Sequence, residues 1–253
     1  MADAAAARAA TIPRETGAVL LALDGVVAGY GGPAVLKGVS LAVGRGRLVT
    51  VVGPNGHGKS TLLRTISGLT RRTAGTITVA GRPTAGLSAS AVARLGVAHV
   101  PQGDLLFPEM TVGENLMMGA YLERDERATA RRLDEVFALL PKLADRRRQI
   151  ASSLSGGERR MVGIGRGLMM GAEIMLIDEP SLGLAPLVIE QIYGVIAALK
   201  ASGRTILLVE ENPARVADIA DAMHLLDDGE IVWSGPPAEL LAREELMSTY
   251  LGG

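Results

Sequence analysis

The sequence contains Gly53-Pro54-Asn55-Gly56-His57-Gly58-Lys59-Ser60, which fits the pattern G-x-x-x-x-G-K-[ST]. A short apolar run, Leu48 to Val52, precedes this stretch, and apolar residues at helical spacing follow it between positions 62 and 69. Glycines are needed in such a loop because its backbone N–H groups must turn inward around phosphate oxygens, which side chains would obstruct. The helix that follows adds a favourable dipole. The sequence therefore predicts a phosphate-binding loop between a strand and a helix.

The side chains of this loop have separate expected roles. Lys59 is expected to reach the β- and γ-phosphates of a nucleotide, and the hydroxyl of Ser60 is expected to bind Mg²⁺. We interpret His57 as a solvent-facing loop residue rather than a proton-transfer group. The alternative, a glycine loop with a purely structural role, is disfavoured by the strand-loop-helix setting. The predicted nucleotide contacts in this part of the chain are Gly53, Pro54, Asn55, Gly56, His57, Gly58, Lys59, Ser60 and Thr61.

Two acids follow a second buried-strand pattern. Ile174-Met175-Leu176-Ile177 is continuously apolar and ends in Asp178 and Glu179. At the carboxyl end of such a strand, Asp178 can hold Mg²⁺ and Glu179 can polarise a water molecule for attack on a γ-phosphate. Taken alone, the pair would be an acidic loop after a strand. Together with the phosphate-binding loop, it predicts nucleotide hydrolysis.

Composition narrows the class of protein. The chain has 253 residues, a formal net charge of −1 and a pI near 6.3, so no strong basic field attracts nucleic acid, and none is expected as a partner. It has no cysteine, which excludes disulfides and thiolate metal sites. Its apolar runs are far shorter than the roughly 20 residues needed to span a bilayer. Residues 1–18 lack an apolar core, so we expect a disordered tail rather than a secretory signal, and a cytoplasmic location.

Apolar periodicity indicates an α/β fold. Val-, Ile- and Leu-rich runs at 19–23, 48–52, 76–79, 97–100, 174–177 and 205–209 alternate with turn residues and helical patterns, which is typical of a largely parallel sheet. Residues 111–154 show helical spacing alone and are predicted to be a helical insertion. Residues 222–226 and 230–234 flank Asp227-Asp228-Gly229 and predict a hairpin.

A third motif separates protein families. Leu154-Ser155-Gly156-Gly157-Glu158 lies just before an apolar-periodic helix, where a serine is also an ordinary helix N-cap. With the two preceding motifs present, it resembles the signature of ATP-binding cassette (ABC) ATPases. The resemblance implies that this signature contacts ATP held by the phosphate-binding loop of a second subunit, so that two chains share two ATP sites. The residues so assigned are Ser155, Gly156, Gly157 and Glu158.

Other elements of the ABC family occur in the expected order. Tyr30 matches the aromatic that stacks on adenine, and Gln102 matches the loop glutamine that approaches Mg²⁺ and the attacking water. Ser181-Leu182-Gly183-Leu184 matches the loop by which one subunit touches the other. The resemblance implies a P-loop NTPase fold with the RecA-like core of ABC ATPases and an N-terminal antiparallel β region. It also implies a single nucleotide-binding domain over residues 19–253, with a helical subdomain inserted at about 104–168.

The chain departs from the ABC pattern after its last core strand. Most members have a γ-phosphate-sensing histidine there, whereas Leu208-Val209-Glu210-Glu211-Asn212 places Glu211 at that position. A carboxylate is repelled by a phosphate, so Glu211 is not expected to donate to it, although it stays among the candidate catalytic residues. This segment, together with Ser181 to Pro186 and Tyr250 to Gly253, resembles the smaller ATPase of importers for branched-chain amino acids, urea or amides.

The resulting prediction is Mg²⁺-dependent ATP hydrolysis that powers solute import. Ser60, Gln102 and Asp178 are the expected metal-site residues, and Glu179 is the expected general base, with Gln102 and Glu211 as further catalytic candidates. Expected partners are a second ATPase subunit, identical or a larger paralogue, a membrane permease and, indirectly, an external solute-binding protein. The chain would lie peripherally on the inner face of the cell membrane. Two alternatives stay open: a soluble ABC ATPase without a transport role, and a regulatory ATP-binding module, which Glu211 motivates.

Overall fold

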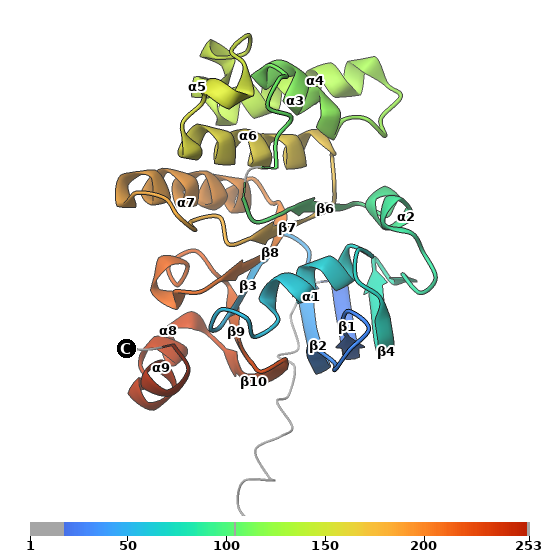
Figure 1. Cartoon of the computed structure of the whole chain (residues 1–253), viewed down its shortest axis with the longest axis vertical. Coiled ribbons are helices and arrows are strands. Elements are labelled where there is room, and N and C mark those ends of the chain that lie inside the picture. The colour runs from blue at the N-terminus through green and yellow to red at the C-terminus, as the bar shows by residue number, and fades with distance from the viewer. Residues whose placement is uncertain (1–17, 104, 252–253) are drawn as a thin grey trace, which may run out of the picture.

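A six-stranded sheet forms the centre of the protein (Figure 1), in the order β10-β9-β3-β8-β7-β6. The computed structural model describes residues 18–103 and 105–251, so the expected tail lies almost wholly outside the described residues, and Gly252 and Gly253 lie outside them too. All strand pairs in this sheet are parallel except β9 with β10. The strands are β3 (Leu48–Val52), β6 (Val97–Val100), β7 (Ile174–Asp178), β8 (Thr205–Glu210), β9 (Ala222–Asp227) and β10 (Glu230–Gly235).

Strands β3, β7 and β8 are buried along their whole length, because apolar layers cover both faces of the sheet. Alternate residues of β3 belong to the two layers: Leu48 and Val52 lie in the apolar cluster that includes residues of α6 (Gly156–Met169) and α7, whereas Val49 and Val51 lie in the cluster that includes residues of α1. The continuous apolar runs in the sequence are therefore the two-sided core of a parallel sheet. The helices around them are α1 (Lys59–Ile66), α2 (Ala89–Arg94) and α7 (Pro186–Ala201).

A second sheet confirms the expected N-terminal antiparallel β region. It has four strands in the order β2-β1-β4-β5, with antiparallel pairing throughout. Its buried side chains form one cluster with α1 and with alternate residues of β3, β7 and β8, so this sheet and α1 lie on the same face of the central sheet. The strands are β1 (Val19–Ala28), β2 (Leu36–Gly44), β4 (Arg72–Val79) and β5 (Arg82–Pro83).

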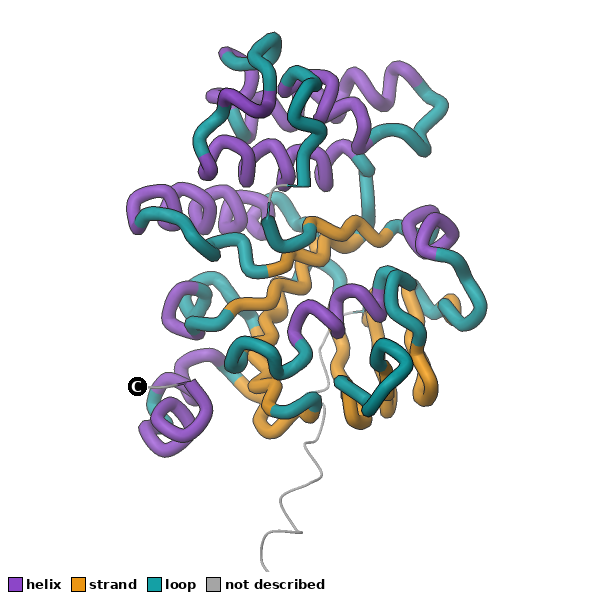
Figure 2. Tube along the Cα trace, viewed as in Figure 1, coloured by secondary structure: helices purple, strands orange, loops and turns teal. Residues whose placement is uncertain are grey.

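Helices alone form the upper part of the molecule in Figure 2, whereas strands and helices mix below. In this part α6 packs against α3 and α4, and Gly165 of α6 leaves the space that Leu116 and Val136 occupy. We keep about 104–168 as the proposed bounds of the helical subdomain. The elements are α3 (Val112–Gly119), α4 (Glu126–Leu139), α5 (Pro141–Asp145), the 3-10 turn η2 (Ala151–Ser153) and α6 (Gly156–Met169).

The C-terminal part begins with the predicted hairpin, which β9 and β10 form around Asp228 and Gly229. A 3-10 turn, η3 (Pro213–Arg215), follows β8, and α8 (Pro237–Leu241) and α9 (Glu244–Leu251) follow the hairpin. Among the described residues, no helix is long and apolar enough to cross a bilayer.

Candidate functional site

The phosphate-binding loop connects β3 to α1, and two glycines allow its path. Gly53 lies so close to β9 that a Cβ atom there would be 2.1 Å from the carbonyl oxygen of Leu226. Gly58 is the N-cap of α1 with φ of 108°, a left-handed conformation that side chains disfavour. Because α1 begins at Lys59, the free N–H groups of its first turn lie directly after the loop.

Lys59 has its ammonium group buried inside the loop, with only 3% of the residue exposed. Its Nζ donates to the carbonyl oxygens of Gly53 at 2.8 Å and of Pro54 at 3.0 Å. The same Nζ lies 3.0 Å from Oε1 of Glu179. The cation is thus fixed between the loop backbone and the acid at the end of β7, where its charge is only weakly screened.

The two acids at the end of β7 differ in their contacts. Asp178 is 1% exposed, and its Oδ1 accepts a hydrogen bond from Ser60 Oγ at 3.0 Å. Burial, with a smaller contribution from the Glu179 charge, raises the pKa of the Asp178 carboxyl. Glu179 has φ of 41°, unusual for a residue with a side chain, and its Oε2 accepts from Gln102 Nε2 at 2.9 Å.

This arrangement brings together five residues predicted from separate motifs: Lys59, Ser60, Gln102, Asp178 and Glu179. The Ser60 hydroxyl and the Asp178 carboxylate supply hard oxygen donors, which suit Mg²⁺ when phosphate oxygens and water complete its coordination. The described residues include no group of three or more His, Cys, Asp or Glu side chains that could hold a metal without a substrate. The residues therefore fit a magnesium ion bound together with nucleotide.

Tyr30 lies beside this centre and is 60% exposed. Its hydroxyl is 3.3 Å from Thr61 Oγ1 and accepts from Arg64 Nη1 at 3.5 Å, so α1 holds the tyrosine next to the end of the loop. The exposed ring is open to a stacking partner. Arg64 was not predicted from the sequence, because its contact with Tyr30 depends on the fold.

The signature residues lie elsewhere in the chain. Ser155 is the N-cap of α6, and its hydroxyl forms a capping box with Glu158, which also pairs with Arg146 at 2.9 Å. In Figure 1, α7, β7 and β8 lie between α6 and α1. The signature and the phosphate-binding loop therefore do not form one site within a single chain.

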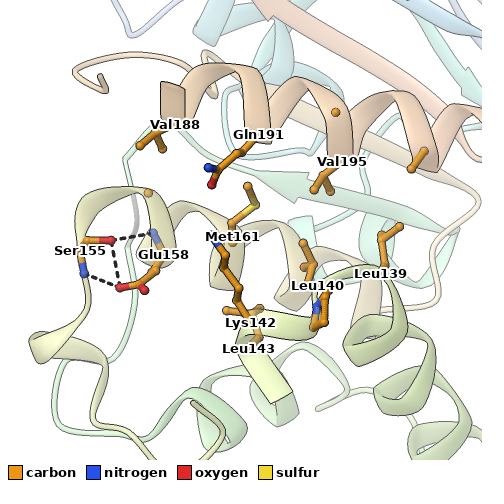
Figure 3. A pocket seen from close by; sticks show the side chains of 14 residues that line it. Leu139, Leu140, Lys142, Leu143, Ser155, Glu158, Met161, Val188, Gln191 and Val195 are labelled. Carbon is orange, nitrogen blue, oxygen red and sulfur yellow. Dashed lines mark hydrogen bonds between the residues drawn. The ribbon is translucent and has the colours of Figure 1, made fainter. Parts of the chain in front are cut away.

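A pocket of about 690 Å³ lies behind the signature, between α5, α6 and α7 (Figure 3). Its walls are mainly apolar and include Met161 of α6 and Val195 of α7. At the signature end the two helices touch: a Cβ atom on Gly157 would lie 2.4 Å from Cγ1 of Val188. Gly157 is therefore required for close packing as well as for the motif.

One residue of the predicted site, His57, behaves differently from its sequence-based interpretation. His57 is not simply solvent-facing: its side chain is 36% exposed and its Nδ1 lies 2.8 Å from Oδ1 of Asp227 in the β9–β10 hairpin. Glu211 is exposed, whereas its neighbour Glu210, which was not among the predicted site residues, is 1% exposed and has several hydrogen-bond partners. An acid in the last position of an apolar strand was the available signal.

Comparisons with known proteins decide the family. A profile described as ABC transporter matches residues 36–182. The chain belongs to the ABC transporter family. It is 40% identical to the high-affinity branched-chain amino acid transport ATP-binding protein BraG of Pseudomonas aeruginosa, over 92% of this chain and 100% of BraG. It is 35% identical to the probable branched-chain amino acid transport ATP-binding protein LivF of Archaeoglobus fulgidus, over 89% of this chain and 95% of that protein.

Solved structures agree with this assignment. The crystal structure of the ADP conformation of an ATP-binding cassette of an ABC transporter superposes with a TM-score of 0.81 and 26% identity, covering 91% of this ABC ATPase and 97% of that chain. A nucleotide-free ATP-binding cassette from an ABC transporter gives a TM-score of 0.80 at 26% identity, covering 90% and 97%. The predicted P-loop NTPase fold is confirmed, and this member of the family is an ATPase.

Proposed function

We propose that this ATPase powers the import of branched-chain amino acids through a membrane permease. The proposal is supported by two relatives: BraG of Pseudomonas aeruginosa is a branched-chain amino acid transport ATP-binding protein, and LivF of Archaeoglobus fulgidus is described as a probable one. The partners are a second ATPase subunit, the permease and, through the permease, an external solute-binding protein. The chain then works in the cytoplasm, held peripherally at the membrane by the permease.

The proposed reaction is hydrolysis of ATP to ADP and phosphate. Lys59 and the loop N–H groups hold the β- and γ-phosphates, while Ser60 and Asp178 hold the metal. When bound, Mg²⁺ neutralises charge on the phosphate oxygens. Glu179 accepts a proton from a water molecule whose oxygen attacks the γ-phosphorus, and the bond from that phosphorus to the β,γ-bridging oxygen breaks, so that ADP leaves.

The remaining predicted residues have supporting roles in this proposal. Gln102 orients the carboxylate of Glu179 through its hydrogen bond at 2.9 Å and approaches the metal and the water. Tyr30 stacks on adenine. Ser155, Gly156, Gly157 and Glu158 bind the γ-phosphate held by the other subunit, because within one chain they lie apart from the loop. Glu211 is the weakest candidate, since its exposed side chain is not drawn into the catalytic cluster.

Permease docking is supported by exposed apolar side chains in and just before the helices of the proposed helical subdomain. Leu105, Phe107, Met117, Met118 and Tyr121 are large apolar residues that are each at least 37% exposed. Residues 105 and 107 follow closely on Gln102, which contacts the general base. In this proposal, a permease segment bound there transmits motion to Glu179 through the loop that carries Gln102.

The observation that carries the function is the contact of Lys59 and Gln102 with the single carboxylate of Glu179. The test is phosphate release and uptake of labelled leucine in proteoliposomes that contain the chain, its partner ATPase, permease and binding protein. Wild-type protein should drive uptake with ATP, and Glu179→Gln should abolish both signals while ATP still binds. ATP hydrolysis without leucine uptake, but with uptake of urea or an amide, would overturn the solute assignment alone.

A further inference from the structure

Glu210 is a buried carboxylate at the end of β8 that the proposed reaction does not use. Its Oε2 accepts from Ser181 Oγ at 2.9 Å and from the Tyr193 hydroxyl. Its Oε1 accepts from Arg215 Nη1 at 3.2 Å and from the backbone N of Glu211 at 3.0 Å. Burial, together with the neighbouring Glu210 carboxylate, raises the pKa of the Tyr193 phenol. Tyr193 therefore keeps its proton and donates a hydrogen bond to Glu210.

These contacts join segments that are otherwise separate in the chain. Ser181 belongs to the loop after the general base, Tyr193 to α7 and Arg215 to η3. Arg215 Nη1 also donates to Ser181 Oγ at 2.8 Å, which closes a triangle with Glu210. A buried charge is costly unless its partners satisfy it, and an apolar residue at a strand end would often be as stable. We therefore infer that Glu210 is present to hold the loop of Ser181, helix α7 and η3 in fixed relative positions.

The geometry concerned is that of Glu179. Its φ of 41° is a strained conformation, which persists only where the surroundings hold it. The backbone N of Glu179 donates to the carbonyl oxygen of Val209 at 3.1 Å, and two residues later Ser181 is held by Glu210. Consecutive residues of β8 thus fix both ends of the three-residue turn that presents the catalytic carboxylate.

The same loop continues to the signature. A Cβ atom on Gly156 would lie 3.3 Å from Cδ2 of Leu184, so the loop after Ser181 lies against the beginning of α6. Glu210 therefore fixes one end of a segment whose other end adjoins the γ-phosphate-binding motif proposed for the second site. It also accepts from the backbone of Glu211, in the position where a phosphate-sensing residue is expected.

We propose that Glu210 is a positioning residue for ATP hydrolysis. It touches neither nucleotide nor metal. It acts through Ser181 and its contacts with the segment after β8, holding the turn at Glu179 and the subunit-contact loop in one arrangement. The inference rests on the proposed catalytic role of Glu179.

The first test is Glu210→Gln, which nearly keeps the side-chain volume. Its amide NH₂ cannot accept the hydrogen bonds that one carboxylate oxygen accepts, either from Ser181 and Tyr193 or from Arg215 and the Glu211 backbone. We expect kcat for ATP to fall about tenfold or more while KM changes less than about threefold, because only the transition-state geometry is affected. Glu190→Gln, which alters an exposed acid on α7, is the matched control and should leave both constants unchanged. A kcat within about twofold of wild type, or a raised KM at constant kcat, would overturn the proposal.

The second test separates positioning from general destabilisation. Ser181→Ala should lower kcat. The double variant Ser181→Ala with Glu210→Gln should have a kcat no lower than that of the slower single variant, because both substitutions disrupt the same hydrogen bond between Ser181 and Glu210. Additive losses would contradict action through Ser181. Should Glu210→Gln fail to fold, Tyr193→Phe removes one donor and leaves the carboxylate in place, and an unchanged kcat there together with an unchanged kcat in Ser181→Ala would refute the proposal.

The proposed function can fail independently of this inference. Its own failure would appear as absent ATP turnover in wild-type protein with its partners, or as unimpaired turnover in Lys59→Ala. Failure of the positioning role would appear only in the Glu210 and Ser181 variants, against normal wild-type hydrolysis.

Discussion

The ammonium of Lys59 lies 3.0 Å from Oε1 of Glu179, so the proposed phosphate ligand and the proposed general base form an ion pair. A bound γ-phosphate must compete with this carboxylate for the same cation. Binding of ATP therefore has an electrostatic cost, and it releases Glu179 to face the attacking water. Charge on the base should weaken substrate binding while it enables the chemistry.

Glu179→Gln should for this reason bind ATP more tightly than wild type. We expect the dissociation constant of a fluorescent ATP analogue to fall by at least about threefold, equal to roughly 0.6 kcal/mol. Phosphate release should fall at least about a hundredfold, because the proton acceptor is gone. Lys59→Ala serves as the control that loses binding. An unchanged dissociation constant in Glu179→Gln would show that the ion pair does not oppose ATP.

Asp178→Asn should raise the Mg²⁺ concentration needed for half-maximal hydrolysis by about tenfold or more, since one charged oxygen ligand is lost. Asp145→Asn, an exposed acid in the helical part, should leave the titration unchanged. Because burial raises the pKa of Asp178, its protonated form extends to higher pH than for an exposed aspartate, and metal-dependent activity should decline on the acidic side. A Mg²⁺ requirement independent of residue 178 would remove it from the metal site.

Glu179→Gln should also form a dimer that depends on ATP, because each signature lies apart from the loop of its own chain. Size-exclusion chromatography with ATP and with ADP tests this directly. Adding Lys59→Ala to the variant should abolish the dimer. A monomer under all conditions, together with a complex formed only when a larger paralogue is mixed in, would indicate a heterodimeric motor.

Gly53→Ala should destabilise the protein much more than Gly56→Ala. A Cβ atom at position 53 would lie 2.1 Å from the Leu226 carbonyl oxygen, whereas position 56 has no atom within 4 Å and carries only the strain of its φ of 84°. We expect losses of about 3 kcal/mol or more and about 1 kcal/mol, respectively, in urea unfolding. Equal losses would mean that β9 moves away from the loop without cost.

Two histidines, the buried His224 and the partly buried His99, should make the protein less stable in mild acid. Burial lowers the pKa of His99 and of His224 from 6.5 to about 4, so both are neutral when folded and take up protons on unfolding below pH 6.5. Stability should therefore decline as pH falls from about 6.5 towards about 4, by roughly 2 kcal/mol for each histidine between pH 7 and pH 5. His224→Gln should reduce this decline in urea unfolding, and an equal decline in wild type and variant would exclude His224 as its source.

The sequence predicted those parts of the site whose residues are neighbours in the chain and follow directly on a buried strand. The loop from Gly53 to Ser60 and the acids after Ile177 are local patterns, and buried parallel strands place their carboxyl ends at one edge of a sheet. Strand β2 was not predicted because its sequence is not a continuous apolar run. Two of its residues, Lys37 and Gly38, are exposed. The six-residue helix α2 was also missed, as a short segment with little apolar periodicity.

Contacts between side chains that are distant in sequence could not be predicted from local sequence patterns. His57 and Asp227 are 170 positions apart, and Ser181 and Glu210 are 29 apart, so only the fold brings them together. Glu211 differs from the family motif, which places a histidine at this position. The neighbouring Glu210 gave a different kind of signal, a charge at a position where the strand pattern calls for an apolar residue.

The contact between Gly53 and the carbonyl oxygen of Leu226 restricts the choice of amino acid at position 53 much more than at position 226. Any amino acid at position 226 presents the same carbonyl, so substitutions there are limited only by the need to fill the buried space with an apolar side chain. Position 53 accepts no side chain at all. The shape of the phosphate-binding loop can thus be inherited unchanged while the hairpin that supports it diverges in sequence.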